Sequence, residues 1–375
     1  MSLIDELQEV LKQQMTKQEL IPVEDACLKR LPTMDPIIDR LVFGGGIPFG
    51  CFAMFTGHPG SFKTTFGACI GALLRKHHSN NIMVVYLDSE GSTTQQRLAM
   101  LGLTGVTPFV GVTIEKVNGV INTIGKLKRD NPKYKDIHFL VIWDSIASTP
   151  TEAELNVDDI NKVIGLKSRI LSFYLPKWIN SVLLKYGVTI IAINQLRDKV
   201  GMGMMAPSTT LKNLSYDKTL PGGNAVLFLS NIILEHKVKQ TFEDSTSPYG
   251  IRAYLVEIKS VKNKFFVDNL RLNLVFSPVL GYLPEFSQFE LLKQLKFVVS
   301  SGGYWRSTIP EIDIKFRLKE LAEKISHDES FKKTWDLLVE KAVSTVESNC
   351  MKGVVLDSDN GNGDENDIVE QVDQP

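Results

Sequence analysis

Short apolar runs alternate with helical stretches through the middle of the chain. From about residue 35 onward, four strongly apolar segments are separated by stretches with helical periodicity. These segments are CFAMFTG (51–57), NIMVVYLDS (81–89), FLVIWDS (139–145) and VTIIAINQ (188–195). Strands that are apolar throughout and that alternate with helices are typical of a parallel sheet covered on both faces. The pattern therefore predicts an α/β fold.

Three further apolar runs follow without helices between them. They are AVLFLSNIILEH (225–236), AYLVEIKSVKN (253–263) and LRLNLVFSP (270–278), and we expect them to form an antiparallel extension of the sheet. Helical periodicity returns between residues 285 and 347, which predicts a small C-terminal helical domain. At the other end, residues 3–16 place their apolar side chains on one helical stripe.

The pattern divides the chain into four segments. We expect an N-terminal helix and linker (1–30), an α/β core (31–284), a C-terminal helical domain (285–350) and an acidic, disordered tail (351–375). The chain from residue 356 onward carries seven acids and no base, so residues 1–355 hold 42 bases against 36 acids, a net charge of +6. A mildly basic body with an acidic tail suits a polyanionic partner, although a merely solubilising terminus remains open at this point.

Composition excludes several classes of protein. The four cysteines lie far apart, with no CxxC pair and no histidine at ligand spacing, so neither a disulfide framework nor a zinc site is indicated. No apolar run reaches the roughly 20 residues of a membrane span, and the start of the chain is acidic where a signal peptide is basic. We therefore expect a cytoplasmic protein.

The stretch GHPGSFKTT (57–65) lies between the first strand and a helix. It differs from the phosphate-binding pattern G-x-x-x-x-G-K-[ST] because Phe62 replaces the second glycine. In a strand, loop and helix of this kind, the loop amides face phosphates, Lys63 reaches the terminal phosphates and the Thr64 hydroxyl binds Mg²⁺. Phe62 is costly only if its position requires a positive φ or leaves no room for a side chain. A structural turn is the alternative.

Acidic residues follow two of the neighbouring strands. Asp144 ends the third strand, where an aspartate beside such a loop usually assists Mg²⁺, and Glu90 follows the second strand, where it can activate a water. Each acid alone is more typical of a helix cap. Because the carboxyl ends of parallel strands share one crevice, the pair favours a catalytic site.

A stretch of nearly thirty residues with little periodicity follows Asn194 and Gln195, RDKVGMGMMAPSTTLKNLSYDKTLPGGNA. A loop of this length in a compact domain is either functional or disordered. Its lysines and Arg197 can contact the phosphates of a nucleic acid, and its methionines and Val200 can insert between the bases. A mobile surface lid is the alternative interpretation.

Taken together, these motifs resemble the RecA recombinase family. The resemblance spans about residues 30–345 and rests on LPTMDPIIDRLVFGGGIPFG, GHPGSFKTT, YLDSEGS, VIWDSIAS, AINQLRDKVG, GGNA and SVKNK, in this order. The S-F-K-[ST] form of the loop is most similar to the UvsX branch of large bacteriophages. The resemblance implies a RecA-like P-loop ATPase core.

The resemblance also implies a DNA-dependent ATPase that uses ATP and Mg²⁺. Glu90 is then the water-activating glutamate and Gln195 the sensor of the terminal phosphate. Lys262 and Lys264 match lysines that reach the ATP of the neighbouring subunit. Nucleotide contacts are implied for Gly57, His58, Pro59, Gly60, Ser61, Phe62, Lys63, Thr64 and Thr65, and for Arg97, which replaces an adenine-stacking tyrosine.

For DNA, the resemblance implies two loops and a helix. The first loop is 152–166, and the helix after it carries Arg169 and Ser172. The second loop supplies Arg197, Lys199, Val200, Gly222, Gly223 and Asn224. Pro176 and an apparent one-residue insertion near Lys177 depart from the family pattern, at a place where the resemblance implies a further DNA contact.

The implied function is assembly of a helical filament on single-stranded DNA, with homologous pairing to duplex DNA and strand exchange in recombination, repair and recombination-dependent replication. The resemblance also implies that the N-terminal helix packs on the next protomer and that the acidic tail matches a regulatory segment. A loading mediator and a single-strand-binding protein are expected partners, in the host bacterial cytoplasm if the chain is phage-encoded.

Two alternatives share the core. A ring-forming RecA-fold DNA helicase predicts closed hexamers and an N-terminal primase-binding domain, which we do not see before residue 35. A non-catalytic RecA-like mediator has less need for the complete set formed by Lys63, Thr64, Glu90, Asp144 and Gln195.

Overall fold

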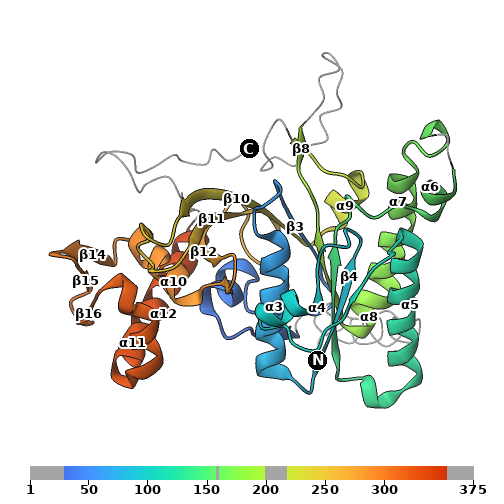
Figure 1. Ribbon diagram of the computed structural model, residues 1–375. Helices are drawn as coiled ribbons and strands as arrows, with labels where there is room; N and C mark the ends of the chain where they lie inside the picture. Colours follow the sequence, from blue (N-terminus) through green and yellow to red (C-terminus); the bar gives the residue numbers. More distant parts are fainter. Residues whose placement is uncertain (1–28, 158–159, 199–217, 353–375) are drawn as a thin grey trace.

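A nine-stranded sheet forms the centre of the protein (Figure 1). The computed structural model describes residues 29–157, 160–198 and 218–352 of the 375-residue chain. The strand order is β13-β12-β11-β10-β3-β7-β6-β4-β5. The predicted α/β fold, with a mainly parallel sheet, an antiparallel extension and C-terminal helices, is confirmed.

The parallel half of the sheet consists of the strands predicted from the four apolar runs and one short edge strand. They are β3 (Phe52–Gly57), β4 (Ile82–Asp88), β5 (Pro108–Phe109), β6 (His138–Asp144) and β7 (Val188–Ile193). Alternate residues of β6 face opposite cores, Ile142 on one side and Trp143 on the other. Both faces are buried, which explains why these strands are apolar throughout.

Helices cover both faces of this half (Figure 1). Helix α3 (Lys63–His78) belongs to one core, while α5 (Ile114–Asp130), α7 (Leu166–Trp178) and the π-helical segment η4 (Ile179–Leu183) belong to the other. The short elements in this part are β1 (Arg30–Leu31), η1 (Ile37–Val42), β2 (Ile47–Pro48), α4 (Gln95–Met100), η2 (Pro132–Tyr134), α6 (Glu152–Asn156), η3 (Ile160–Lys162) and α8 (Leu184–Tyr186).

The antiparallel half consists of β10 (Ile232–Phe242), β11 (Ala253–Asn263), β12 (Arg271–Ser277) and β13 (Gly281–Tyr282). Strand β10 also pairs in parallel with β3, which joins the two halves. The expectation of one strand over 225–236 is wrong in its first half, because α9 (Asn224–Leu229) occupies it. The Ser230 hydroxyl donates to the Val226 carbonyl at the end of this helix. Just before β10 begins, the Asn231 side chain accepts from the Phe52 amide of β3.

The C-terminal segment is helical with a small sheet. Its helices are α10 (Pro284–Gln294), η5 (Leu318–Glu320), α11 (Leu321–His327) and α12 (Glu329–Met351). The strands β14 (Val298–Ser301), β15 (Tyr304–Ser307) and β16 (Lys315–Phe316) form a three-stranded sheet that the sequence pattern does not predict. No helix in the described ranges is long and apolar enough to cross a membrane.

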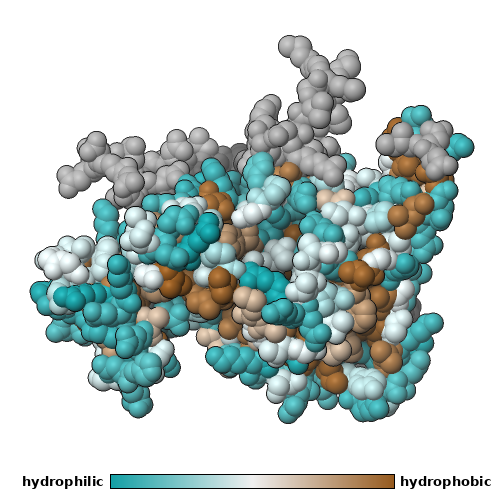
Figure 2. Space-filling view, viewed as in Figure 1, coloured by the Kyte–Doolittle hydropathy of each residue, from teal (hydrophilic) through white to brown (hydrophobic). Residues whose placement is uncertain are grey.

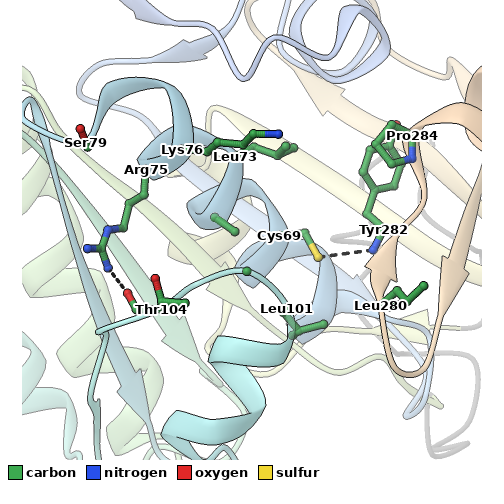
Figure 3. A pocket seen from close by; sticks show the side chains of 12 residues that line it. Cys69, Leu73, Arg75, Lys76, Ser79, Leu101, Thr104, Leu280, Tyr282 and Pro284 are labelled. Carbon is green, nitrogen blue, oxygen red and sulfur yellow. Dashed lines mark hydrogen bonds between the residues drawn. The ribbon is translucent and has the colours of Figure 1, made fainter. Parts of the chain in front are cut away.

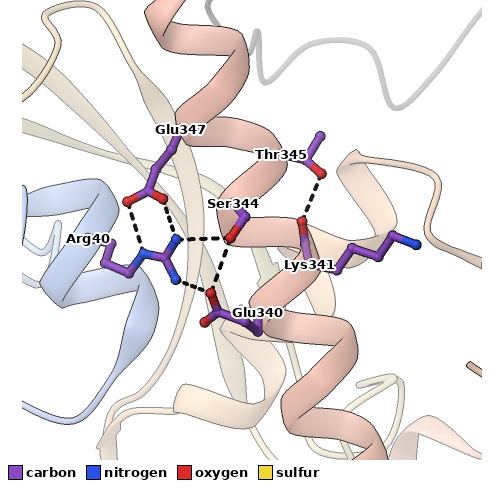
Figure 4. Close-up of polar contacts among 6 residues, drawn as sticks. All are labelled: Arg40, Glu340, Lys341, Ser344, Thr345 and Glu347. Atoms are coloured by element: carbon purple, nitrogen blue, oxygen red, sulfur yellow. Dashed lines mark hydrogen bonds and ion pairs between the residues drawn. The ribbon is translucent and has the colours of Figure 1, made fainter.

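One arginine ties this segment to the start of the core (Figure 4). Arg40 on η1 donates from Nε to the Glu347 carboxylate at 2.9 Å and pairs with the same carboxylate through Nη2. It also donates to Glu340 at 2.5 Å and to the Ser344 hydroxyl at 3.0 Å, all on α12. A two-pronged arginine–carboxylate pair fixes orientation as well as distance. Helix α12 is therefore held against η1.

Candidate functional site

The glycine-containing loop connects β3 to α3 and folds back on itself. The Ser61 hydroxyl donates to the His58 carbonyl at 2.8 Å. Lys63, the first residue of α3, is buried, and its ammonium donates to the His58 carbonyl at 2.7 Å and to the Ser61 hydroxyl at 3.2 Å. Burial lowers the pKa of Lys63 to about 8. An ammonium held inside a loop at a helix N-terminus is suited to an anionic ligand.

Phe62 adopts the left-handed backbone conformation, with a φ of 64°. This position therefore does require a positive φ, which explains the glycine of the common pattern. The ring turns into the core, where its centroid lies 4.9 Å from that of Tyr254 and 5.3 Å from that of Phe276. Aromatic packing offsets the backbone strain, and the loop keeps its shape without the glycine.

Asp144, at the end of β6, faces the start of α3. Its Oδ2 accepts hydrogen bonds from the Thr64 hydroxyl at 2.7 Å and from the Tyr86 hydroxyl at 3.0 Å. Burial, with a smaller contribution from the Glu90 and Asp88 carboxylates, outweighs the two hydrogen bonds and raises the pKa of Asp144 to about 6. A hydroxyl and a buried carboxylate are oxygen ligands of the kind that Mg²⁺ takes beside a phosphate. The side chains present therefore fit Mg²⁺ with a nucleoside triphosphate.

Glu90 stands on the turn after β4 with an exposed side chain. Its Oε1 accepts from the Ser145 hydroxyl at 2.9 Å, the Ser148 hydroxyl at 3.0 Å and the Gln195 amide nitrogen at 3.1 Å. The structure thus brings together Glu90 and Gln195, which lie 105 positions apart in the chain. Three donors on one carboxylate oxygen fix its position while its other oxygen stays available.

Sequence reasoning missed several residues that build this site. Asp88 accepts from the amides of Glu90 and Gly91 at 3.0 and 2.9 Å and so shapes the turn that presents Glu90. Ser145 and Tyr86 hold the two carboxylates of the site. Their only signal in the sequence is that each lies at or near the end of an apolar strand.

Arg97 is half-buried on α4, away from the Thr64 hydroxyl and from the carboxylates of Glu90 and Asp144. Its guanidinium contacts the Val279 carbonyl at 3.4 Å, in the turn between β12 and β13. Gly281 of this turn lies against Thr65 and Cys69 of α3. Farther along α3 is a separate cavity of about 500 Å³ (Figure 3). None of the nucleotide-contact residues predicted from the sequence lines this cavity.

The described ends of the long loop form a short ladder. Strand β8 (Arg197–Asp198) pairs antiparallel with β9 (Lys218–Thr219), two residues after Gln195. Lys199 and Val200 lie outside the described residues. After β9, the Asn194 amide donates to the Pro221 carbonyl at 2.9 Å, so both ends of the loop meet beside the nucleotide site.

Gly222, Gly223 and Asn224 form the start of α9, which packs on α7. A Cβ on Gly223 would lie 2.8 Å from the Ser168 side chain, and both glycines have positive φ. Glycine is therefore required for the close approach of the two helices. Arg169 is exposed on α7 in the same region, and the Ser172 hydroxyl donates to the Ser168 carbonyl of its own helix at 2.7 Å.

The predicted first DNA loop is partly helical, since residues 152–166 contain α6 and η3. Next to Lys177, the segment η4 is π-helical, and a π turn closes on one more residue than an α turn, so it can accommodate the one-residue insertion that the resemblance implies there. Pro176 is accommodated inside α7, and Lys177 is exposed.

Lys262 and Lys264 lie apart from the loop of their own chain. In the sheet, Lys262 on β11 pairs with Ile233 on β10. Ile233 in turn pairs with Met54 on β3, three residues before Gly57. Its ammonium donates to the Leu227 and Phe228 carbonyls at 3.1 and 2.8 Å, at the end of α9. Burial lowers the pKa of Lys262, and the Lys264 charge lowers it further. Lys264 is exposed.

The fold and the site define a P-loop nucleotide-binding protein with a RecA-like core. The family described as RecA N-terminal domain matches residues 14–277. The chain is 29% identical to Protein RecA of Mesomycoplasma hyopneumoniae strain J, covering 81% of this chain and 83% of that protein. It is 28% identical to Protein RecA of Trichodesmium erythraeum, covering 70% and 67%. The chain therefore belongs to the RecA family, whose members are DNA-dependent ATPases of recombination and repair.

Proposed function

We propose that this protein is an ATP-dependent recombinase that assembles as a helical filament on single-stranded DNA and exchanges strands with a homologous duplex. The observation that carries the proposal is the hydrogen bond between Glu90 and Gln195. Glu90 belongs to the nucleotide side of the site, and Gln195 is two residues from the strand that begins the long loop. One contact therefore links hydrolysis to the segment proposed to bind DNA.

In this proposal the residues at the strand ends divide the work of hydrolysis. Lys63 and the loop amides hold the phosphates, while Thr64 and Asp144 hold Mg²⁺. When bound, Mg²⁺ neutralises charge on the phosphate oxygens. Glu90 accepts the proton of the attacking water through its carboxylate. Gln195 exchanges its bond with Glu90 for the terminal phosphate, and this movement is transmitted to β8.

Filament assembly is supported by the position of Lys262 and Lys264. Because they lie on the sheet away from their own loop, they are suited to completing a site on a neighbouring protomer. We further propose the UvsX-like branch on the basis of Phe62. A loading mediator, a single-strand-binding protein and regulation of duplex DNA access by the acidic tail belong to the same proposal.

The direct test is ATP hydrolysis with and without single-stranded DNA, combined with negative-stain microscopy using a slowly hydrolysed ATP analogue. We expect DNA-stimulated hydrolysis, its loss in Lys63→Ala, and extended striated fibres. Closed rings favour a helicase instead, and binding without hydrolysis favours a mediator.

Mixing two inactive variants tests the shared site. Lys63→Ala disables its own loop but keeps the bridging lysines, whereas the double variant Lys262→Ala/Lys264→Ala keeps its loop. If the lysines act across the interface, an equimolar mixture regains about one quarter of the hydrolysis, because random neighbours complete that fraction of sites. If the mixture stays as inactive as each variant alone, the lysines do not act in trans.

A further inference from the structure

One exposed aromatic side chain on α7 is not accounted for by the packing of the helix. The buried side of α7 carries Leu171, Leu175 and Trp178. Phe173 points away from this side, and 68% of its surface is exposed. Apolar side chains also gather on the arm formed by α6 and the start of α7 (Figure 2). A single exposed phenylalanine is not unusual by itself, so its neighbours decide its meaning.

Two cations flank Phe173 at helical spacing. Arg169 and Lys177 lie four residues before and after it, which places all three on one side of α7 and about 6 Å apart in turn along the axis. Both cations are exposed. In the part of the chain that the structure describes, neither forms an ion pair with a carboxylate. An aromatic ring between two unpaired cations is suited to a nucleic acid strand, whose bases can stack on the ring and whose phosphates can meet the cations.

The ring is supported by other aromatic residues. Its centroid lies 5.5 Å from that of Tyr174, which stacks on Trp178 at 5.9 Å and 9°. Trp178 in turn meets Trp143 edge-on at 6.2 Å, and Trp143 precedes Asp144 at the end of β6. The series ends in the buried core beside the nucleotide site. A binding residue on such support is held in place before its ligand arrives.

We propose that Phe173 is a stacking platform for a base of single-stranded DNA, and that Arg169 and Lys177 hold the phosphates on either side of it. The inference rests on the proposed function, and it assigns to Phe173 a role that family resemblance does not. Stacking accepts every base, because each has a π face, so the platform suits a protein that binds strands regardless of sequence. The start of α9 packs against Ser168 and Leu171, on the other side of α7, so it does not cover the platform.

The test compares a strand that has bases with one that lacks them. Binding of fluorescein-labelled oligodeoxythymidine to the full-length protein is measured by anisotropy with ATP and Mg²⁺, alongside an abasic strand of equal length. We expect Phe173→Ala to weaken binding of the thymidine strand about 5- to 100-fold, the effect of losing one stacked base. Binding of the abasic strand should not change. Phe173→Trp should restore thymidine binding.

Salt dependence separates the ring from the cations. Phe173→Ala should leave the slope of log affinity against log salt unchanged, whereas Arg169→Ala or Lys177→Ala should each flatten it by about 0.7, the contribution of one phosphate contact on a single strand. Leu337→Ala serves as the matched control, since Leu337 is 63% exposed on α12. It should bind both strands as the wild type does.

Three results would overturn the platform. Equal binding of both strands by Phe173→Ala and the wild type removes the role. An equal loss on both strands shows that Phe173 supports the fold or the contact between protomers. A tryptophan variant as weak as the alanine variant excludes stacking. Failure of the wild type to bind either strand would overturn the proposed function as well, so the two failures are distinguishable.

Discussion

Replacing Phe62 separates two opposing contributions to the stability of the phosphate-binding loop. The backbone at this residue is left-handed, with a φ of 64°, which costs a residue with a side chain about 1–2 kcal/mol relative to glycine. The ring is half-buried against Tyr254 and Phe276. Removing a fully buried phenylalanine costs about 3–5 kcal/mol, so about 2 kcal/mol is reasonable for this ring.

These magnitudes predict an unusual order of stability. Phe62→Ala loses the ring and keeps the strain, so we expect it to lose about 2 kcal/mol. Phe62→Gly loses the same ring but relieves the strain, so it should lose about 1 kcal/mol or less. The glycine variant should therefore be the more stable of the two. Inside a helix the order is reversed, because glycine is about 1 kcal/mol less favourable than alanine.

The measurement is the midpoint of urea unfolding, followed by intrinsic fluorescence on dilute, nucleotide-free protein. Ala72→Gly inside α3 is the control and should show the ordinary order, with glycine less stable. Binding of a fluorescent ATP analogue should change by less than about threefold in Phe62→Gly, because the backbone amide remains. If Phe62→Ala equals or exceeds Phe62→Gly in stability, the positive φ is not costly. If Phe62→Gly abolishes nucleotide binding, the ring belongs to the nucleotide site.

Three further changes test other parts of the structure. Asp144→Asn should stabilise the nucleotide-free protein at pH 7 by about 1–2 kcal/mol and abolish ATP hydrolysis. Because its pKa is raised to about 6, ionised Asp144 opposes folding. The stability gained by Asp144→Asn, followed as a rise in melting temperature, should therefore shrink as pH falls from 7 towards 4. A gain that stays constant over this pH range would contradict the reasoning. Arg40→Ala should lower the stability of the C-terminal segment by about 1–3 kcal/mol, measured by hydrogen exchange of the α12 amides. Arg40→Lys should lower it by nearly as much, since lysine cannot form the paired contacts to Glu347. Unchanged exchange of α12 in Arg40→Ala would show that this contact does not stabilise the segment. Gly223→Ala should cost about 2 kcal/mol and weaken DNA binding, whereas Gly119→Ala, where an added Cβ meets nothing within 4 Å, should be neutral or stabilising in the same thermal melts.

The parallel strands and the phosphate-binding loop could be predicted because their signals are local. An apolar run ending in a glycine-containing loop before Lys63 specifies strand, turn and helix within about twenty residues. The positions of Glu90 and Asp144 at strand ends also follow, because parallel strands end at one edge. Their partners do not follow. Ser145 and Tyr86 meet these carboxylates through contacts between strands, which no spacing along the chain reveals.

The errors fall where a short apolar run suits a helix and a strand equally. Residues 225–236 read as one strand, yet α9 ends at Leu229, where Ser230 and the distant Lys262 bond to the carbonyls of its last turn. Strands β14 to β16 are two to four residues long and partly exposed, so they carry too little periodicity to be recognised. The sequence also does not reveal that Phe62 tolerates a left-handed φ, because the rings that pack against it, Tyr254 and Phe276, are distant in the sequence.

The ammonium of Lys262 closes the last turn of α9, the helix whose first turn carries Gly223 and Asn224. Any assembly that draws this lysine toward a triphosphate on the adjoining subunit must release two carbonyls at the end of that helix. Nucleotide bound at the boundary between subunits would then make α9 and the glycines before it less rigid. Loss of nucleotide would stiffen α9 in the subunit that donates the lysine.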